Sequence, residues 1–558
     1  MMRRLARSTL LLLAGSVSLL DGQGAPGSTR AESRAGGRSA GAGSTGATGA
    51  TAVAAIPSAP PKPTLVVFLT IDQLGSDYLA RFGGNLTGGL KRLRDEGATW
   101  LYGAHDHAIT ETAPGHAATM SGRFPVHTGI ASNSQGVNTR EAPLIDADDT
   151  GASPFRFKGT VLLDWMLAAD PTTRSLSVSR KDRGAILPVG TVKTHVYWFA
   201  SNGRFTTSRY YRDTLPTWVA RFNARNIPQR YAGQEWTPLL PADRYAEPDS
   251  VSFEADGDYT FPHRLSRDSA RAARDIRDWP WMDSLTLAFA LEGTRTLGLG
   301  SAANRTDLLA ISLSTTDAVG HRYGPDSKEI HDQILRLDRY LGQFLDSLLA
   351  LRGRDRVVIA LTADHGVQPI PELRSAWYPN HDAQRVDPAP AWRTVRAALR
   401  RAGVDSNAVD SDDGFRVVDP EAFRRANVDP DAIARLWVAE LRTMNGVASA
   451  DLIADLARAD TTTNVVARRW LHQFAPDGPI RAVVSLEPFA YWKSTTYATH
   501  GSPNEADARV PVLFWGAGIA AGRRAGEARV VDMAPTLAQW LRIRPLERLD
   551  GVPLTLTP

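Results

Sequence analysis

The sequence predicts an α/β fold with a mostly parallel central sheet, helices on both faces, and inserted cap segments. Two observations predict it. Short apolar runs of buried-strand length recur along the chain, at 64–72, 307–313, 356–364 and 509–516. Helical periodicity lies between them, as at 329–351, where apolar residues recur at every third or fourth position. Strands that alternate with amphipathic helices indicate a parallel sheet covered on both sides.

The first residues are typical of an export signal. A positively charged start, MMRRLAR, precedes the apolar stretch TLLLLAGSVSLL, which is too short for a comfortable membrane span. We therefore predict a signal peptide over 1–21, a flexible linker rich in Gly, Ala, Ser, Thr and Pro over 22–63, and a periplasmic or secreted product without stable membrane insertion. An uncleaved anchor is the alternative. The chain has no cysteine, which excludes a lipoprotein start and disulfides.

The remaining residues, 64–558, are predicted to form the main folded domain. A chain of 558 residues with 43% hydrophobic content could form several domains, but one large α/β unit with insertions fits as well. In the first part, GGLKRLRDEGATW predicts a helix that ends at Gly97. Two stretches depart from the strand–helix rhythm, one at about 190–285, dense in Trp, Tyr, Arg and Pro, and one at about 380–480, with helical patterns. We interpret both as insertions that form a cap beside the sheet.

The charge pattern excludes a nucleic-acid partner. The formal net charge is +4, and residues 1–60 alone hold six arginines against Asp21 and Glu32. That segment therefore accounts for the whole excess, and the rest of the chain is near neutral. No basic run elsewhere is typical of a phosphate-backbone contact.

Metal-ligand residue types follow the predicted strands. In open parallel sheets, ligands bind beyond the carboxyl ends of the strands. Singly, each such residue could be a helix cap or a packed histidine, but three aspartates and three histidines at one sheet edge indicate a metal site. Mixed histidine and carboxylate ligands suit Zn²⁺ best, with other divalent ions possible. The candidates are Asp72, Asp317, His321, Asp364, His365 and His500.

Thr112 is the candidate nucleophile. It stands where a helix N-cap is expected, with Pro114 in the first turn and Gly122 at the end. A hydroxyl there faces free backbone N–H groups, which makes a natural phosphate site. A simple capping threonine is the alternative. Beside a metal, however, the pKa of a hydroxyl falls and a nucleophile can form.

These motifs resemble the alkaline phosphatase superfamily. The resemblance rests on T-x-P-G-H at 112–116, followed by G-x-x-P-x-x-x-G at 122–129, and on the segments 177–190, 197–223 and 530–543. It covers about Thr64 to Leu554 and is strongest to the nucleotide pyrophosphatase/phosphodiesterase branch, within it to the PafA-type bacterial alkaline phosphatases. The resemblance implies one metal held by Asp72, Thr112, Asp364 and His365, a second held by Asp317, His321 and His500, and phosphoryl contacts from Asn133, Lys181 and Arg183.

The implied function is metal-dependent hydrolysis of small phosphate monoesters at a two-zinc site, through a phosphothreonine intermediate. Lys181 and Arg183 lie two residues apart, so in an extended segment their side chains point to the same side and could both hold a monoester dianion. Two alternatives stay open. One is a phosphodiesterase or nucleotide pyrophosphatase of the same superfamily, whose members usually lack this pair. The other is a non-catalytic metal-containing binding protein. Sulfatases need a modified Cys or Ser, so Thr112 argues against that branch.

Overall fold

Three parallel strands form the centre of the molecule. The computed structural model describes residues 62–254, 257–377, 384–495 and 497–557. In it, β1 (Leu65–Ile71) lies between β8 (Asp307–Leu313) and β9 (Val357–Thr362) and pairs in parallel with both. Every residue of these strands is buried. Burial on both faces explains why the runs are continuously apolar rather than alternating.

The full sheet has nine strands, in the order β17-β2-β16-β9-β1-β8-β3-β4-β5. Five of its eight pairings are parallel, and the antiparallel ones involve β16 and β5. The predicted fold class is therefore confirmed. The other strands are β2 (Ala98–Ala104), β3 (Ser175–Ser179), β4 (His195–Phe199), β5 (Phe205–Thr206), β16 (Arg509–Gly516) and β17 (Gly522–Arg523).

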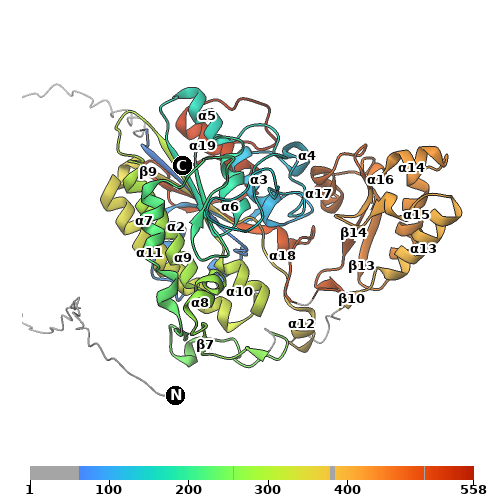
Figure 1. Cartoon of the computed structure of the whole chain (residues 1–558), viewed down its shortest axis with the longest axis horizontal. Coiled ribbons are helices and arrows are strands. Elements are labelled where there is room, and N and C mark those ends of the chain that lie inside the picture. Colours follow the sequence, from blue (N-terminus) through green and yellow to red (C-terminus); the bar gives the residue numbers. More distant parts are fainter. Residues whose placement is uncertain (1–61, 255–256, 378–383, 496, 558) are drawn as a thin grey trace, which may run out of the picture. The chain divides into compact units, whose positions relative to one another are not determined.

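Two groups of helices cover this sheet, one on either side (Figure 1). In the first, the long helix α11 packs against the others and buries the apolar face that its periodicity predicts. The helix α2 ends at Gly97, as predicted. The first group is α2 (Gly89–Glu96), α9 (Trp281–Thr296), α10 (Thr315–Tyr323) and α11 (Lys328–Arg352). The second is α3 (Thr112–Ser121), α5 (Leu162–Ala169), α6 (Asp182–Ile186) and α19 (Met533–Leu541).

A second part of the molecule, here called the lobe (residues 384–492), has its own sheet and hydrophobic core. Its strands run antiparallel in the order β11-β12-β14-β13, and α13 packs on α15 over a distinct hydrophobic cluster (orange in Figure 1). The lobe includes the described residues of the predicted second insertion, from 384 onward, and its sheet continues to Leu486. Its main elements are α13 (Ala389–Arg401), β11 (Val409–Asp410), β12 (Phe415–Val417), α14 (Pro420–Arg425), α15 (Pro430–Leu441), β13 (Val447–Leu452), α17 (Val465–Gln473) and β14 (Ile480–Leu486).

The predicted first insertion, about 190–285, needs correction at its N-terminal end. Strands β4 and β5 extend the central sheet, so residues 195–206 belong to the core. Tyr197, Trp198 and Phe199 are buried there. Aromatic residues favour strands as much as they favour a cap, which is why composition alone misplaced this boundary.

The N-terminal predictions concern residues outside the described part of the chain. This applies to the signal peptide at 1–21 and to all but the last two residues of the linker at 22–63. Within the residues that the structure describes, no helix has the length and apolar character to cross a bilayer.

Candidate active site

Three buried aspartates meet at the carboxyl ends of the central strands. Asp72 directly follows β1, Asp364 follows β9 by two residues, and Asp317 lies in the first turn of α10 after β8. Because β8, β1 and β9 are parallel neighbours, these ends open at one edge of the sheet. The side chains of all three aspartates are at most 5% exposed.

The histidines complete two groups of ligand types. Ligand atoms of Asp72, Asp364 and His365 all lie within 4.8 Å of one another, and so do those of Asp317, His365 and His500. Nε2 of His321 lies 3.2 Å from Oδ1 of Asp317 and 3.2 Å from Nε2 of His500. The structure thus brings together all six metal-ligand candidates of the sequence analysis.

Backbone contacts set the orientation of these imidazoles. Nδ1 of His365, His500 and His321 each lies 2.7–2.9 Å from a backbone carbonyl oxygen. A carbonyl only accepts hydrogen bonds, so each ring donates from Nδ1 and, when neutral, keeps a lone pair on Nε2. This second contact is typical of histidines that ligate a metal.

Unsatisfied buried atoms test whether the site suits a cation. Within the described residues, both carboxylate oxygens of Asp72, Oδ2 of Asp364 and Nε2 of His365 are buried without a hydrogen bond. Burial raises the pKa of Asp72 to about 7, and the negative charges of Asp317 and Asp364 add to the effect. Buried groups of this kind are costly unless a charge compensates them. Oxygen and imidazole donors fit divalent cations, Zn²⁺ among them.

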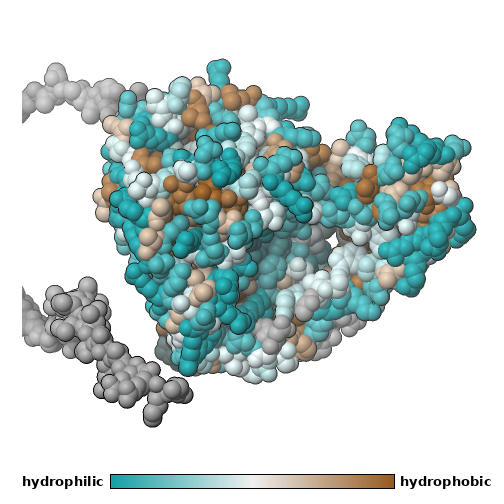
Figure 2. Space-filling view, in the orientation of Figure 1, coloured by the Kyte–Doolittle hydropathy of each residue, from teal (hydrophilic) through white to brown (hydrophobic). Residues whose placement is uncertain are grey.

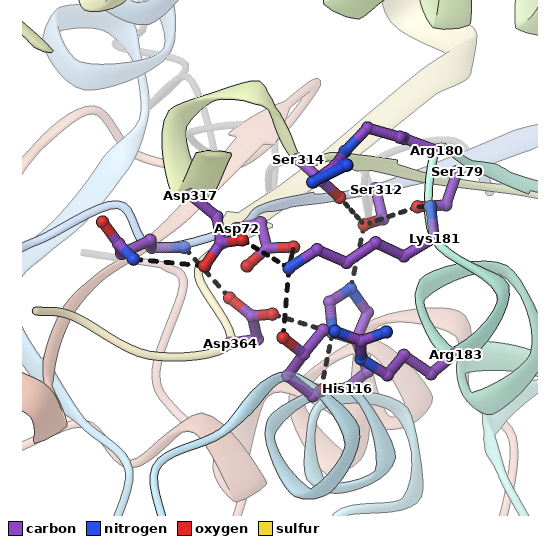
Figure 3. Close-up of polar contacts among 12 residues, drawn as sticks. Asp72, His116, Ser179, Arg180, Lys181, Arg183, Ser312, Ser314, Asp317 and Asp364 are labelled. Carbon is purple, nitrogen blue, oxygen red and sulfur yellow. Dashed lines mark hydrogen bonds and ion pairs between the residues drawn. The ribbon is translucent and has the colours of Figure 1, made fainter. Parts of the chain in front are cut away.

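Lys181 links the two groups (Figure 3). Its Nζ lies 2.7 Å from an oxygen of Asp72, an ion pair without a directed hydrogen bond, and donates to Oδ2 of Asp317 at 2.7 Å. It also donates to Oγ1 of Thr112 at 3.2 Å. One ammonium therefore touches both carboxylate groups and the candidate nucleophile.

Thr112 is the first residue of α3, a helix whose ten residues are all buried. The predicted cap position shifts by one residue, because Glu111 has the extended N-cap conformation. Pro114 lies in the first turn, and Gly122 ends the helix with φ 66°, both as predicted. The hydroxyl of Thr112 thus lies at the positive end of a buried helix.

Asn133 is held against the start of the same helix. Its Oδ1 accepts from the backbone N–H of Ala113 at 3.0 Å, and its own N–H donates to Glu111 at 2.7 Å. The next two residues bind the lobe: Ser134 donates to Asp412 and Gln135 to Asp413. The turn that carries Asn133 is therefore anchored on both sides.

The local structure around Arg183 differs from the extended segment assumed in the sequence analysis. Lys181 has extended dihedral angles, but α6 begins at Asp182 and places Arg183 in its first turn. The side chains of Lys181 and Arg183 are therefore not aligned by the alternation of an extended strand. Figure 3 shows the side chain of Arg183 extending from α6 toward the same centre, and its Nε is buried without a hydrogen bond among the described residues.

Two further residues support the site and were missed from the sequence. Gln73, with φ 66°, donates from its backbone to Oδ1 of Asp364 and from Nε2 to Oδ1 of Asp317, both at 3.1 Å. Nδ1 of His116 lies 3.1 Å from Oδ2 of Asp364 and 2.9 Å from the carbonyl of Thr112. The available signals were a polar residue directly after Asp72 and the histidine of T-x-P-G-H, four residues after Thr112.

Known proteins are similar to this chain in both sequence and fold. Residues 66–470 match the family model described as type I phosphodiesterase / nucleotide pyrophosphatase. Alkaline phosphatase PhoK of a Sphingomonas species is 32% identical over 522 residues, which cover 88% of this chain and 90% of that protein. The crystal structure of alkaline phosphatase PafA aligns with a TM-score of 0.82 at 26% identity, over 89% of this chain and 99% of PafA. A structure of PafA with a threonine, an asparagine, a lysine and an arginine substituted aligns with a TM-score of 0.81, also at 26% identity, over 88% of this chain and 98% of that one.

Proposed function

The chain belongs to the type I phosphodiesterase/nucleotide pyrophosphatase family, and from that premise we propose that it is an alkaline phosphatase that hydrolyses small phosphate monoesters. One observation carries the proposal. A buried ammonium, Lys181, contacts a hydroxyl at a helix start, Thr112, and carboxylates of both ligand groups. Nucleophile, phosphate-binding cation and metal ligands therefore share one centre.

Thr112 is the proposed nucleophile. A divalent cation such as Zn²⁺ held by Asp72, Asp364 and His365 beside Thr112 would lower the pKa of the hydroxyl. A second one, held by Asp317, His321 and His500, would stabilise the leaving oxygen. Oγ1 of Thr112 attacks phosphorus in line, the bond to the alcohol oxygen breaks, and the alcohol leaves with a proton. Water then cleaves the phosphothreonine, which releases inorganic phosphate and restores the hydroxyl.

The cations of the chain hold the phosphate. Lys181 and Arg183 would contact non-bridging oxygens, with Asn133 beside them at the start of α3. A monoester dianion carries one more charge than a diester, so two side-chain cations favour the monoester. The substituted PafA structure supports these roles, because its four altered residue types occur here in the same order as Thr112, Asn133, Lys181 and Arg183.

The rival with a specific observation in its favour is a phosphodiesterase, because the family model is described by that activity. The charge of Lys181 and Arg183 is our reason to prefer the monoester. Export to the periplasm or the medium completes the proposal, and it rests on the N-terminal sequence alone.

Rates on two chromogenic esters test the proposal. We expect p-nitrophenyl phosphate to be hydrolysed with a much higher kcat/KM than its bis ester. Both activities should vanish after chelation and return with Zn²⁺. A higher kcat/KM for the diester would make the protein a diesterase, and hydrolysis of neither ester would favour a binding protein.

A further inference from the structure

A pocket of about 390 Å³ adjoins the proposed active site where the lobe meets the rest of the chain. Four of its lining residues are tryptophans: Trp392, Trp437, Trp470 and Trp492. Figure 2 shows the surface recessed between the part that carries α13–α15 and the body around the central sheet. The volume lies within the range of small-molecule sites, which is about 300–1,000 Å³.

These tryptophans do not form one closed core. Trp437 belongs to the core of the lobe, with Trp392 packed against it, whereas Trp470 belongs to a second cluster and Trp492 borders a third. The pocket thus lies where three hydrophobic clusters end. Trp392 and Trp492 are only partly buried. The indole nitrogen of Trp437 is buried and donates no hydrogen bond to any described residue.

Two neighbours of active-site residues form the junction with this pocket. Glu111, directly before Thr112, and Gly501, directly after His500, both line it. A Cβ atom built on Gly501 would lie 3.5 Å from Cγ of Glu111, so the two segments face each other closely. His500 belongs to the ligand group on the side proposed for the leaving oxygen. An alcohol that departs on the side of His500 would therefore be released next to the tryptophan-lined pocket.

We propose that this pocket binds the leaving group of the substrate and that this group is a planar aromatic alcohol without a negative charge. The inference rests on the monoesterase function proposed above. Indole rings favour flat π-systems through stacked and edge-to-face contacts. The pocket has Glu111 and Asp413 among its described lining residues and neither Lys nor Arg, so a second phosphate or a carboxylate is disfavoured.

A matched pair of esters tests the proposal. Benzyl phosphate and cyclohexylmethyl phosphate both release primary alcohols of similar size, one planar and one puckered. We expect the full-length protein to favour benzyl phosphate in kcat/KM by about three- to tenfold, the range of measured aromatic pair contacts. Trp392→Leu and Trp492→Leu should each reduce this ratio toward one while inhibition by inorganic phosphate is unchanged. Trp540→Leu, in a partly buried tryptophan of α19 outside the pocket, is the control and should leave the ratio unaltered.

A binding measurement separates failure of the pocket from failure of the proposed activity. Benzylphosphonate should quench the tryptophan fluorescence of the Thr112→Ala protein more strongly than cyclohexylmethylphosphonate, and Trp392→Leu should weaken this quenching. Equal kcat/KM for the two esters in the wild type would overturn the pocket proposal and leave the monoesterase standing. If neither ester is hydrolysed, the proposed function fails, and absence of selective quenching would then remove the pocket proposal as well.

Discussion

At the scale of single residues, three buried carboxylates surround one ammonium, that of Lys181. Burial alone would raise the pKa of Asp317, but the charges of Lys181 and His321 outweigh it and hold that pKa well below its usual range. The pKa of Asp72, which is buried beside two other carboxylates, is instead raised to about 7. The two aspartates share Lys181 but differ in their other charged neighbours, so their pKa values shift in opposite directions.

Replacement of the proposed nucleophile is the first prediction at this scale. Thr112→Ala should lower kcat for p-nitrophenyl phosphate by at least about a thousandfold, because the covalent step loses its attacking atom. Metal content and inhibition by inorganic phosphate should stay near wild-type values, since the carboxylate and imidazole ligands remain. Substantial residual turnover would show that Thr112 only begins the helix.

The double variant Lys181→Ala with Arg183→Ala tests the preference between ester classes. Charge-assisted contacts are worth about 1.5–3 kcal/mol each, so the loss of one corresponds to roughly ten- to a hundredfold in rate. kcat/KM for the monoester should fall far more than kcat/KM for the bis ester. An equal fall in both would mean that the pair is structural, and the choice of a monoesterase would lose its main support.

Glu254 gives a prediction on stability. It is 3% exposed, and burial followed by repulsion from Glu329 raises its pKa from 4.5 to about 9. The folded protein therefore holds a proton that the unfolded chain releases between pH 4.5 and 9, so this residue makes stability fall as pH rises through that window. Glu254→Gln should raise the free energy of unfolding at pH 9 by about 1–3 kcal/mol and change it little at pH 5. Denaturant unfolding at both pH values, with the exposed Glu527→Gln as control, measures this effect. Equal changes at the two pH values would contradict the assigned titration.

At the scale of elements, helices and strands with a strong periodic or apolar sequence pattern were predicted, and those without one were missed. The runs at 65–71 and 307–313 form β1 and β8 because strands buried on both faces read as continuous apolar segments. β4 was missed because its aromatic residues occur within a Trp- and Tyr-rich stretch. The turn of α6 at Arg183 was missed because a helix of five residues carries no periodic signal.

Helix α3 gives a prediction at this scale, because it lies directly against the backbone of a proposed ligand. A Cβ atom at Gly115 would lie 2.1 Å from the carbonyl oxygen of Asp364. Gly115→Ala must therefore push α3 and Asp364 apart, with a loss of about 1–3 kcal/mol in stability and a fall in kcat that exceeds any change in KM. In the control Gly84→Ala, a Cβ atom meets no atom within 4 Å, so stability and kcat should both stay unchanged. Normal kcat in Gly115→Ala would mean that the spacing of Thr112 and Asp364 tolerates this shift.

At the scale of the whole molecule, residues distant in sequence converge for a topological reason. Asp72, Asp317 and Asp364 are brought together by three parallel strands, and a parallel sheet places such ends at one edge wherever they lie in the chain. That rule made the convergence of the candidate ligands predictable as a group. It does not predict which side chains orient these candidates: the contacts of Gln73 and His116 depend on the packing of α3 and of the turn after β1.

The last prediction concerns metal and global stability. The buried aspartates and Lys181 leave the site with net negative charge, so cations that bind only the native state should stabilise it. Chelation should lower the Tm, and excess Zn²⁺ should restore it; a free metal concentration of 100 times Kd corresponds to about 2.7 kcal/mol. Calorimetry of the wild type against Asp317→Asn/Asp364→Asn provides the comparison. The double variant should respond far less to chelator and to Zn²⁺, because it has lost one carboxylate charge from each ligand group. A Tm of the wild type that is insensitive to both reagents would contradict metal binding at this sheet edge.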